Sequence, residues 1–113
     1  MSKIIRVNIL GSEWIIEYRK LSEEPRLQDC SGFTDWTSRL IVIQDDHETD
    51  LDDPGEMYCK IIRHEIVHAF LFESGLDESS GISEAWATNE EMVDWIARQG
   101  PKIYKAWEEA GAV

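Results

Sequence analysis

The chain has 113 residues, a length that predicts one domain over residues 1–113 with a real hydrophobic core but no room for a second. Its formal net charge is −12, and its 11 Lys and Arg residues are scattered, which argues against a nucleic-acid partner bound through phosphates. No segment approaches the length of a membrane span, and the chain does not start with the apolar stretch of a signal peptide. We therefore expect a cytoplasmic protein with no membrane partner.

The N-terminal segment predicts a β-hairpin. Apolar residues alternate with polar ones over residues 3–10 and again over residues 13–19, which is the period of a half-buried strand. Gly11-Ser12 between the two strands fits a two-residue turn with glycine first.

Two more strands are expected after a segment that is hard to assign. Residues 21–28 contain a proline and fit a short helical turn or a loop equally well. Strands are predicted at residues 30–33 and 39–44, and the second is rich in β-branched residues. Together with the hairpin they predict a small, mainly antiparallel sheet.

An acidic run, residues 45–53, separates this sheet from the helices. It lacks the regular alternation and central glycine of a calcium loop, so we interpret it as a solvated connection rather than a cation site. His47 lies inside this run, which makes it a poor candidate for a metal ligand.

The second half of the chain predicts helices, which gives an α+β fold. Asp53 and Pro54 form a helix start, and Gly75 is a natural stop, so a helix is expected from Pro54 to Ser74. A further helix is expected over residues 83–98. Gly100-Pro101 should end it and begin a last helix, on which Ile103, Trp107 and Ala110 share a face.

The first of these helices carries His64-Glu65-Ile66-Val67-His68, the most informative motif of the chain. Residues four apart lie on one helical face, so His64 and His68 can both direct a ring nitrogen at one zinc ion. Glu65 lies one step round and can act as a catalytic base on water. The alternative is a helix whose histidines are hydrogen-bonded in the core.

A catalytic zinc usually has three protein ligands, and no histidine follows His68, so a carboxylate must complete the site. Helical phase puts Glu90 on an apolar face, whereas Glu91 lies near the polar side and could close a capping box. We expect Glu90, with Glu91 as the alternative. Asp94, one turn on, can accept the second ring N–H of a ligand histidine or pair with Arg98.

The chain resembles the gluzincin group of zinc metallopeptidases, in which His-Glu-x-x-His is followed by a helix carrying Glu-x-x-x-Asp. More narrowly, it resembles small prophage-type proteins of the ImmA/IrrE-like family. The resemblance covers roughly residues 30–98 and lies in the pentad, in the strand Arg39 to Ile43 and in the segment Asn89 to Trp95.

The resemblance implies a minimal zincin-like domain, a short sheet ahead of the active helix, that carries out regulatory proteolysis in mobile elements or stress responses. Its partner would be a protein or peptide substrate, whose backbone would pair with the strand Arg39 to Ile43. Glu65 would move the proton during hydrolysis. The competing hypothesis is a non-catalytic acidic module that mimics nucleic acid and holds structural zinc or none.

Overall fold

The computed structural model describes residues 4–78 and 85–113, which form a four-stranded sheet and two long helices. The elements are β1 (Ile4–Ile9), β2 (Ser12–Arg19), η1 (Leu21–Glu23), η2 (Pro25–Asp29), β3 (Gly32–Asp35), β4 (Leu40–Gln44), α1 (Pro54–Glu73), η3 (Trp86–Thr88) and α2 (Glu90–Glu109). The strand order is β1-β2-β4-β3. β1 and β3 pair antiparallel with their neighbours, whereas β2 and β4 are parallel. The fold is α+β with a mixed sheet.

The predicted hairpin is present, but its turn lies one residue earlier than expected. Ile9 pairs with Ser12, so the two turn residues are Leu10 and Gly11 rather than Gly11 and Ser12. Both have positive φ, 52° and 92° respectively. This conformation matches the right-handed twist of the flanking strands, and the Asn8 side chain supports it by accepting a hydrogen bond from the Gly11 N–H.

β4 lies inside the sheet, between β2 and β3, with Ile41, Val42 and Ile43 fully buried. A continuous apolar run of this kind is typical of an interior strand. The prediction that the strand Arg39 to Ile43 pairs with a substrate backbone is therefore wrong, because both of its edges already bond to neighbours. The edge strands are β1 and β3, and among the described residues β3 has no strand partner on the side away from β4.

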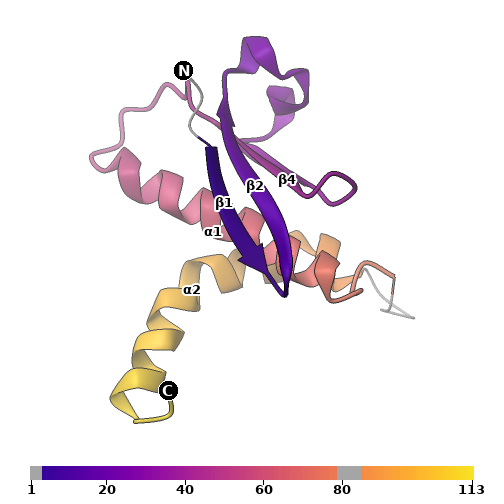
Figure 1. Ribbon diagram of the computed structural model, residues 1–113. Coiled ribbons are helices and arrows are strands. Elements are labelled where there is room, and N and C mark those ends of the chain that lie inside the picture. The colour runs from indigo at the N-terminus through magenta and orange to yellow at the C-terminus, as the bar shows by residue number, and fades with distance from the viewer. Residues whose placement is uncertain (1–3, 79–84) are drawn as a thin grey trace.

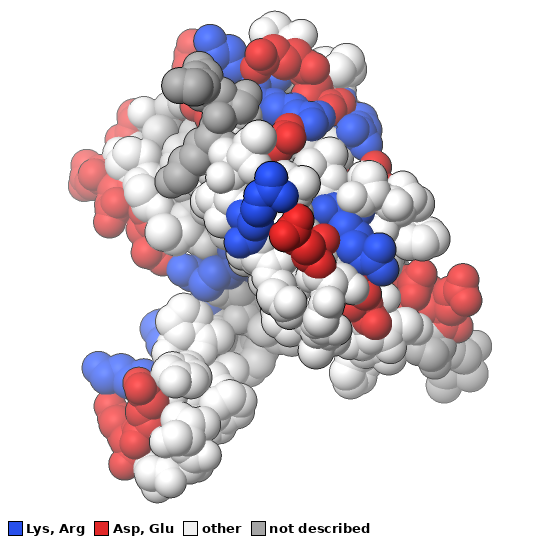
Figure 2. Space-filling model, in the orientation of Figure 1, with Lys and Arg blue, Asp and Glu red and all other residues white. Residues whose placement is uncertain are grey.

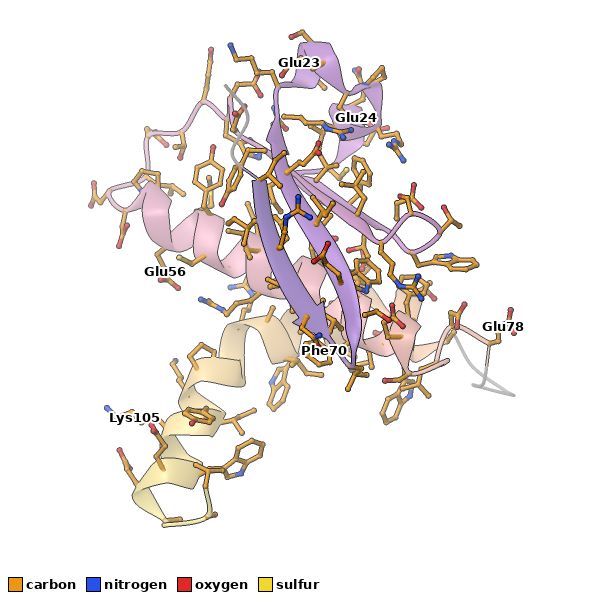
Figure 3. All side chains as sticks on the ribbon, in the orientation of Figure 1. Glu23, Glu24, Glu56, Phe70, Glu78 and Lys105 are labelled. Atoms are coloured by element: carbon orange, nitrogen blue, oxygen red, sulfur yellow. The ribbon has the colours of Figure 1, made fainter. Side chains whose placement is uncertain are left out.

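The segment between β2 and β3, predicted as a helical turn or a loop, forms the two 3₁₀ turns η1 and η2. They are held by the buried carboxylate of Glu24, labelled in Figure 3, which pairs with Arg19 and with Arg26. The Arg26 guanidinium is the main cause that lowers the pKa of Glu24 to about 2. Arg26 also lies over the Phe33 ring at 4.3 Å, which fastens the turns to β3.

α1 begins and ends as predicted. The Asp53 side chain accepts the Glu56 N–H, Pro54 occupies the first turn, and Gly75 follows the last turn with a φ of 77°. Figure 1 shows α1 crossing one face of the sheet. The core between them consists of Ile9, Trp14, Ile16, Ile41, Ile43, Ile61 and Ala69.

α2 differs from the prediction at both ends. The predicted start at Ser83 falls outside the described residues, and the helix itself begins at Glu90 after the 3₁₀ turn η3. Gly100-Pro101 does not end the helix, which continues to Glu109 as one element. Pro101 lacks the N–H that would bond to the Ala97 carbonyl, and the Arg63 Nε atom donates to that carbonyl at 2.7 Å instead.

The surface is mixed in charge and carries one projecting part. On the face drawn in Figure 2, acidic and basic side chains are interleaved over the body of the molecule. Figure 1 shows the C-terminal half of α2 leaving that body. Within residues 4–78 and 85–113, neither long helix has the apolar length needed to cross a membrane.

Candidate metal centre

His64 and His68 lie one turn apart on α1, as the pentad predicts, with their Nε2 atoms 3.2 Å apart. Each Nδ1 atom is occupied on the other side of its ring. His64 Nδ1 lies 3.2 Å from Asp94 Oδ1, and His68 Nδ1 lies 2.6 Å from the Ala87 carbonyl oxygen. Because both oxygens accept, each Nδ1 carries the proton and each Nε2 turns its lone pair toward the other.

Glu90, the first residue of α2, brings a carboxylate to the same point. Its Oε1 atom lies 2.6 Å from His68 Nε2 and 3.5 Å from His64 Nε2. Two lone pairs and an anionic oxygen thus converge on one spot, where either an additional proton or a cation must balance them. Among the described residues, His64, His68 and Glu90 form a group that could hold a metal ion.

Glu90 rather than Glu91 joins the cluster. The expectation that it faces the core is wrong, because its side chain is 72% exposed at the mouth of a pocket. Glu91 is exposed and does not close a capping box. The Asn89 side chain accepts the Met92 N–H and caps the helix by itself.

Glu65 is buried, with 6% of its surface exposed, and no basic side chain pairs with it among the described residues. Burial raises the pKa of this carboxyl group, and a hydrogen bond from the Thr34 hydroxyl to Oε1 at 2.8 Å opposes the rise. The same hydroxyl oxygen lies 3.1 Å from the Glu65 main-chain carbonyl oxygen, so its one hydrogen is shared between two acceptors. β3 therefore fixes the acidic side chain from the sheet side of the site.

Glu65, His68 and Glu90 line a pocket of about 380 Å³ between β3, α1 and η3. Its apolar walls come from Phe33 and Phe72, and the Phe72 ring stacks 6.5 Å from that of His68. The convergent polar groups therefore lie at one side of a cavity with apolar walls, which is a typical arrangement for a ligand site.

Asp94 fulfils both of the roles that the sequence left open. Its Oδ1 atom accepts from His64, and its Oδ2 atom accepts from Arg98 Nε at 2.7 Å. Lys60 Nζ, which the sequence did not single out, lies 2.8 Å from Oδ1. Lys60 and Arg98 hold the pKa of the Asp94 carboxyl group far below its usual range, so it remains an acceptor for the His64 ring.

His47 lies outside the cluster, as expected. Its ring packs 6.1 Å from that of Tyr58, and its Nε2 atom is buried without a hydrogen-bond partner. Nearly all of the acidic run is exposed and has no helix or strand, which agrees with a solvated connection.

Three groups that contact the site residues could not be predicted from the pentad. Thr34 comes from a strand 31 positions away from Glu65, and the Ala87 carbonyl is a main-chain atom, so no side-chain pattern reveals either. Lys60 did leave a signal, because it precedes His64 by four residues and therefore lies on the same helical face.

We compared the chain with protein-family models, curated proteins and solved structures. None of the three comparisons gave a match.

Proposed function

We propose that the protein is a zinc-dependent endopeptidase with the zincin-like arrangement that the motif suggests. The observation that carries this proposal is the convergence of two imidazole lone pairs and the Glu90 carboxylate beside a buried Glu65, with which no basic side chain of the described residues pairs. A structural site would have no use for such an acid, and it would close the coordination shell with a fourth protein ligand. Within the described residues, only three ligands converge.

The spacing of the ligand atoms supports zinc as the ion. Bonds of about 2.0 to 2.1 Å arranged as a tetrahedron separate ligand atoms by about 3.3 to 3.4 Å. The distances from His64 Nε2 to His68 Nε2 and to Glu90 Oε1, 3.2 and 3.5 Å, are close to this value. The distance of 2.6 Å from His68 Nε2 to Glu90 is shorter, and the exposed Glu90 side chain has room to move back.

When bound, zinc supplies Lewis acidity, which activates water and polarises a carbonyl group. Glu65 acts as the base: it accepts the proton of the attacking water and delivers it to the departing amine. Thr34 holds the Glu65 carboxylate in place from β3. Asp94 and the Ala87 carbonyl keep both imidazoles in the tautomer that presents Nε2.

We propose that the substrate backbone pairs with the outer edge of β3. The interior strand β4 cannot take this role, because both of its edges are already paired. Gly32, Phe33 and Thr34 of β3 line the pocket that also contains Glu65. An extended peptide that pairs with this edge would pass the cluster, and its side chains would meet the apolar walls formed by Phe33 and Phe72. We therefore infer a substrate with an apolar side chain near the cleaved bond.

The test is cleavage of a mixed peptide library, read by mass spectrometry, with zinc-loaded wild type, Glu65→Gln and Glu91→Gln. We expect wild type and Glu91→Gln to cut the same peptides, since Glu91 lies outside the cluster. Glu65→Gln should lose at least about a hundredfold in rate, because its amide cannot accept the proton. Equal rates in wild type and Glu65→Gln would refute the proposed base.

The competing hypothesis, a non-catalytic acidic binding module, makes the opposite prediction. It would gain support if zinc-loaded wild type cut no peptide and both variants bound the same protein partner. The net charge of −12 is compatible with either function.

A further inference from the structure

The cleft between β3 and α1 continues past the proposed metal centre on both sides. The cavity of about 380 Å³ described above contains His68, and a second cavity of about 180 Å³ contains His64. The two cavities share four lining residues, which are Cys30, Gly32, Glu65 and Glu90. Two of these are the proposed base, Glu65, and a proposed metal ligand, Glu90. The proposed site of hydrolysis therefore lies where a larger and a smaller cavity meet.

The lining residues show how the two cavities follow each other along β3. Ser31, which precedes the strand, lines only the smaller of the two, whereas Phe33 and Thr34 line only the larger. α1 runs in the same direction, since Ile61 lines the smaller cavity and Phe72 lines the larger. A peptide that lies along β3 past the metal centre would therefore meet one cavity on each side of that centre.

The smaller cavity is narrow because β3 and α1 approach each other closely there. A Cβ atom added to Gly32 would lie only 3.4 Å from Ile61 Cγ2. The remaining lining includes Ser31 and Lys60, and the Lys60 Nζ atom is turned to Asp94 Oδ1 at 2.8 Å. This side of the cleft offers room for a small side chain.

The larger cavity has an aromatic wall. The Phe72 ring stacks 6.5 Å from that of His68 and 6.3 Å from that of Trp36, so three rings follow each other from the metal centre to the β3–β4 turn. Ala87 of η3 also lines this cavity and leaves space because its side chain is small. Aromatic pairs gain stability beyond the area that they bury. This side of the cleft therefore fits a large apolar side chain, above all an aromatic ring.

β3 also sets the direction of a bound peptide. The Gln44 N–H donates to the Ser31 carbonyl, so by the alternation of an antiparallel ladder the main-chain groups of Gly32 and Thr34 point away from β4. Antiparallel pairing with these groups is more stable than parallel pairing. Because β3 runs from the smaller cavity toward the larger one, the N-terminal part of an antiparallel peptide lies in the larger cavity.

We propose that the substrate, in a specificity that rests on the proposed peptidase function, has a large apolar side chain on the N-terminal side of the cleaved bond and a small one on the C-terminal side. Side chains on one face of an extended peptide are two residues apart, so one residue separates the large side chain from the small one. Phe72 is the residue that determines this specificity, because its ring forms the wall of the larger cavity.

Cleavage of a peptide with one phenylalanine among alanine and serine residues tests the direction. Mass spectrometry of the products of zinc-loaded wild type should find phenylalanine within the last two residues of the N-terminal fragment. This product should exceed the one with phenylalanine at the start of the C-terminal fragment at least about tenfold, the discrimination that an apolar pocket provides. The reverse ratio, equal amounts, or no cut in this peptide by an enzyme that cuts others would overturn the proposal.

Binding of four hydroxamates to zinc-loaded wild type, measured by calorimetry, tests the two sides of the cleft without hydrolysis. The hydroxamates of acetyl-Phe-Phe and acetyl-Ala-Ala extend from the metal-binding group toward the N-terminal side of a substrate. The monohydroxamates of benzylmalonyl-Phe amide and methylmalonyl-Ala amide extend toward the C-terminal side. We expect the aromatic compound to bind at least about tenfold more tightly than its alanine counterpart on the N-terminal side, and no more tightly on the C-terminal side.

Two variants assign this preference to one side chain. Phe72→Ala should lose the tenfold gain, because the wall of the larger cavity is removed. Phe70→Ala is the matched control and should keep the gain, since Phe70, labelled in Figure 3, lies on the same helix, is 41% exposed and lines neither cavity. Zinc content is measured for both variants, so that a loss of metal is not read as a loss of specificity.

The outcomes separate this specificity from the peptidase function. The expected binding preference without cleavage of any peptide would refute the peptidase function and support the orientation of the cleft. Equal gains on both sides, a gain on the C-terminal side alone, no binding of any hydroxamate, or a gain that Phe72→Ala keeps would overturn the specificity alone. A wild type that holds no zinc would overturn both.

Discussion

The hydrogen bond from Arg63 to the Ala97 carbonyl explains how α2 continues past Pro101, and it can be tested by a double-mutant cycle. Arg63→Met removes the donor and leaves the carbonyl of a residue that is only 1% exposed without its partner. Pro101→Ala supplies a main-chain N–H at the position that normally bonds to this carbonyl. The second substitution should therefore relieve the cost of the first.

The size of the effect follows from the kind of bond. A hydrogen bond from a charged donor contributes about 1.5 to 3 kcal/mol, so Arg63→Met should lower the free energy of unfolding by about 2 kcal/mol. In the Pro101→Ala background the carbonyl keeps a donor, and the cost should fall below about 1 kcal/mol. The coupling free energy between the two sites is then about 1 kcal/mol or more.

Urea unfolding of wild type, both single variants and the double variant measures this coupling. Lys60→Met in the same two backgrounds is the control, because Lys60 pairs with Asp94 and not with the Ala97 carbonyl. Its cost should not depend on position 101. If the effects of Arg63→Met and Pro101→Ala simply add, the proposed reason for the continuous helix is refuted.

Three further predictions concern the site and the sheet. Asp94→Asn should weaken zinc binding about 10- to 100-fold in a competition titration with a chelator, because His64 loses an anionic partner; unchanged affinity would remove Asp94 from the site. Gly32→Ala should lower the free energy of unfolding, measured in urea, by about 1 to 3 kcal/mol, because the added Cβ would lie 2.9 Å from the Val42 carbonyl oxygen. An unchanged free energy of unfolding would show that β3 can move away from β4 without cost. The pKa of Glu24 is lowered from 4.5 to about 2, so its contribution to stability is complete above pH 4.5 and is lost as the pH falls toward 2; Glu24→Gln should flatten the stability profile over that range, and parallel profiles would contradict the assignment.

Helical spacing predicted the centre of the site from the sequence. The interval of four residues between His64 and His68 fixes their common face, which depends only on residues within one turn of a helix. Glu90 joins the two histidines, but the phase argument for it assumed an apolar, core-facing position, whereas its side chain is exposed. The contact of Asp94 with His64 depends on the packing of α2 against α1.

Features that depend on distant parts of the chain could not be predicted. The apolar run of β4 is typical of an interior strand, but no local pattern indicates that its neighbour on one side is the parallel strand β2. Pro101 is a helix stop by local rules, and the Arg63 side chain, 34 positions before Ala97, compensates for the missing N–H. Thr34 reaches Glu65 only because β3 packs beside α1.

The proposed activity depends most directly on His64, His68 and Glu90 as the ligands of one zinc ion. Metal analysis after dialysis, with wild type, Glu65→Gln, Glu90→Ala and Glu91→Ala, tests this set. We predict one zinc per chain in wild type, in Glu65→Gln and in Glu91→Ala, and lost or much weakened zinc in Glu90→Ala. Normal zinc content in Glu90→Ala, or none in wild type, would contradict this set of ligands.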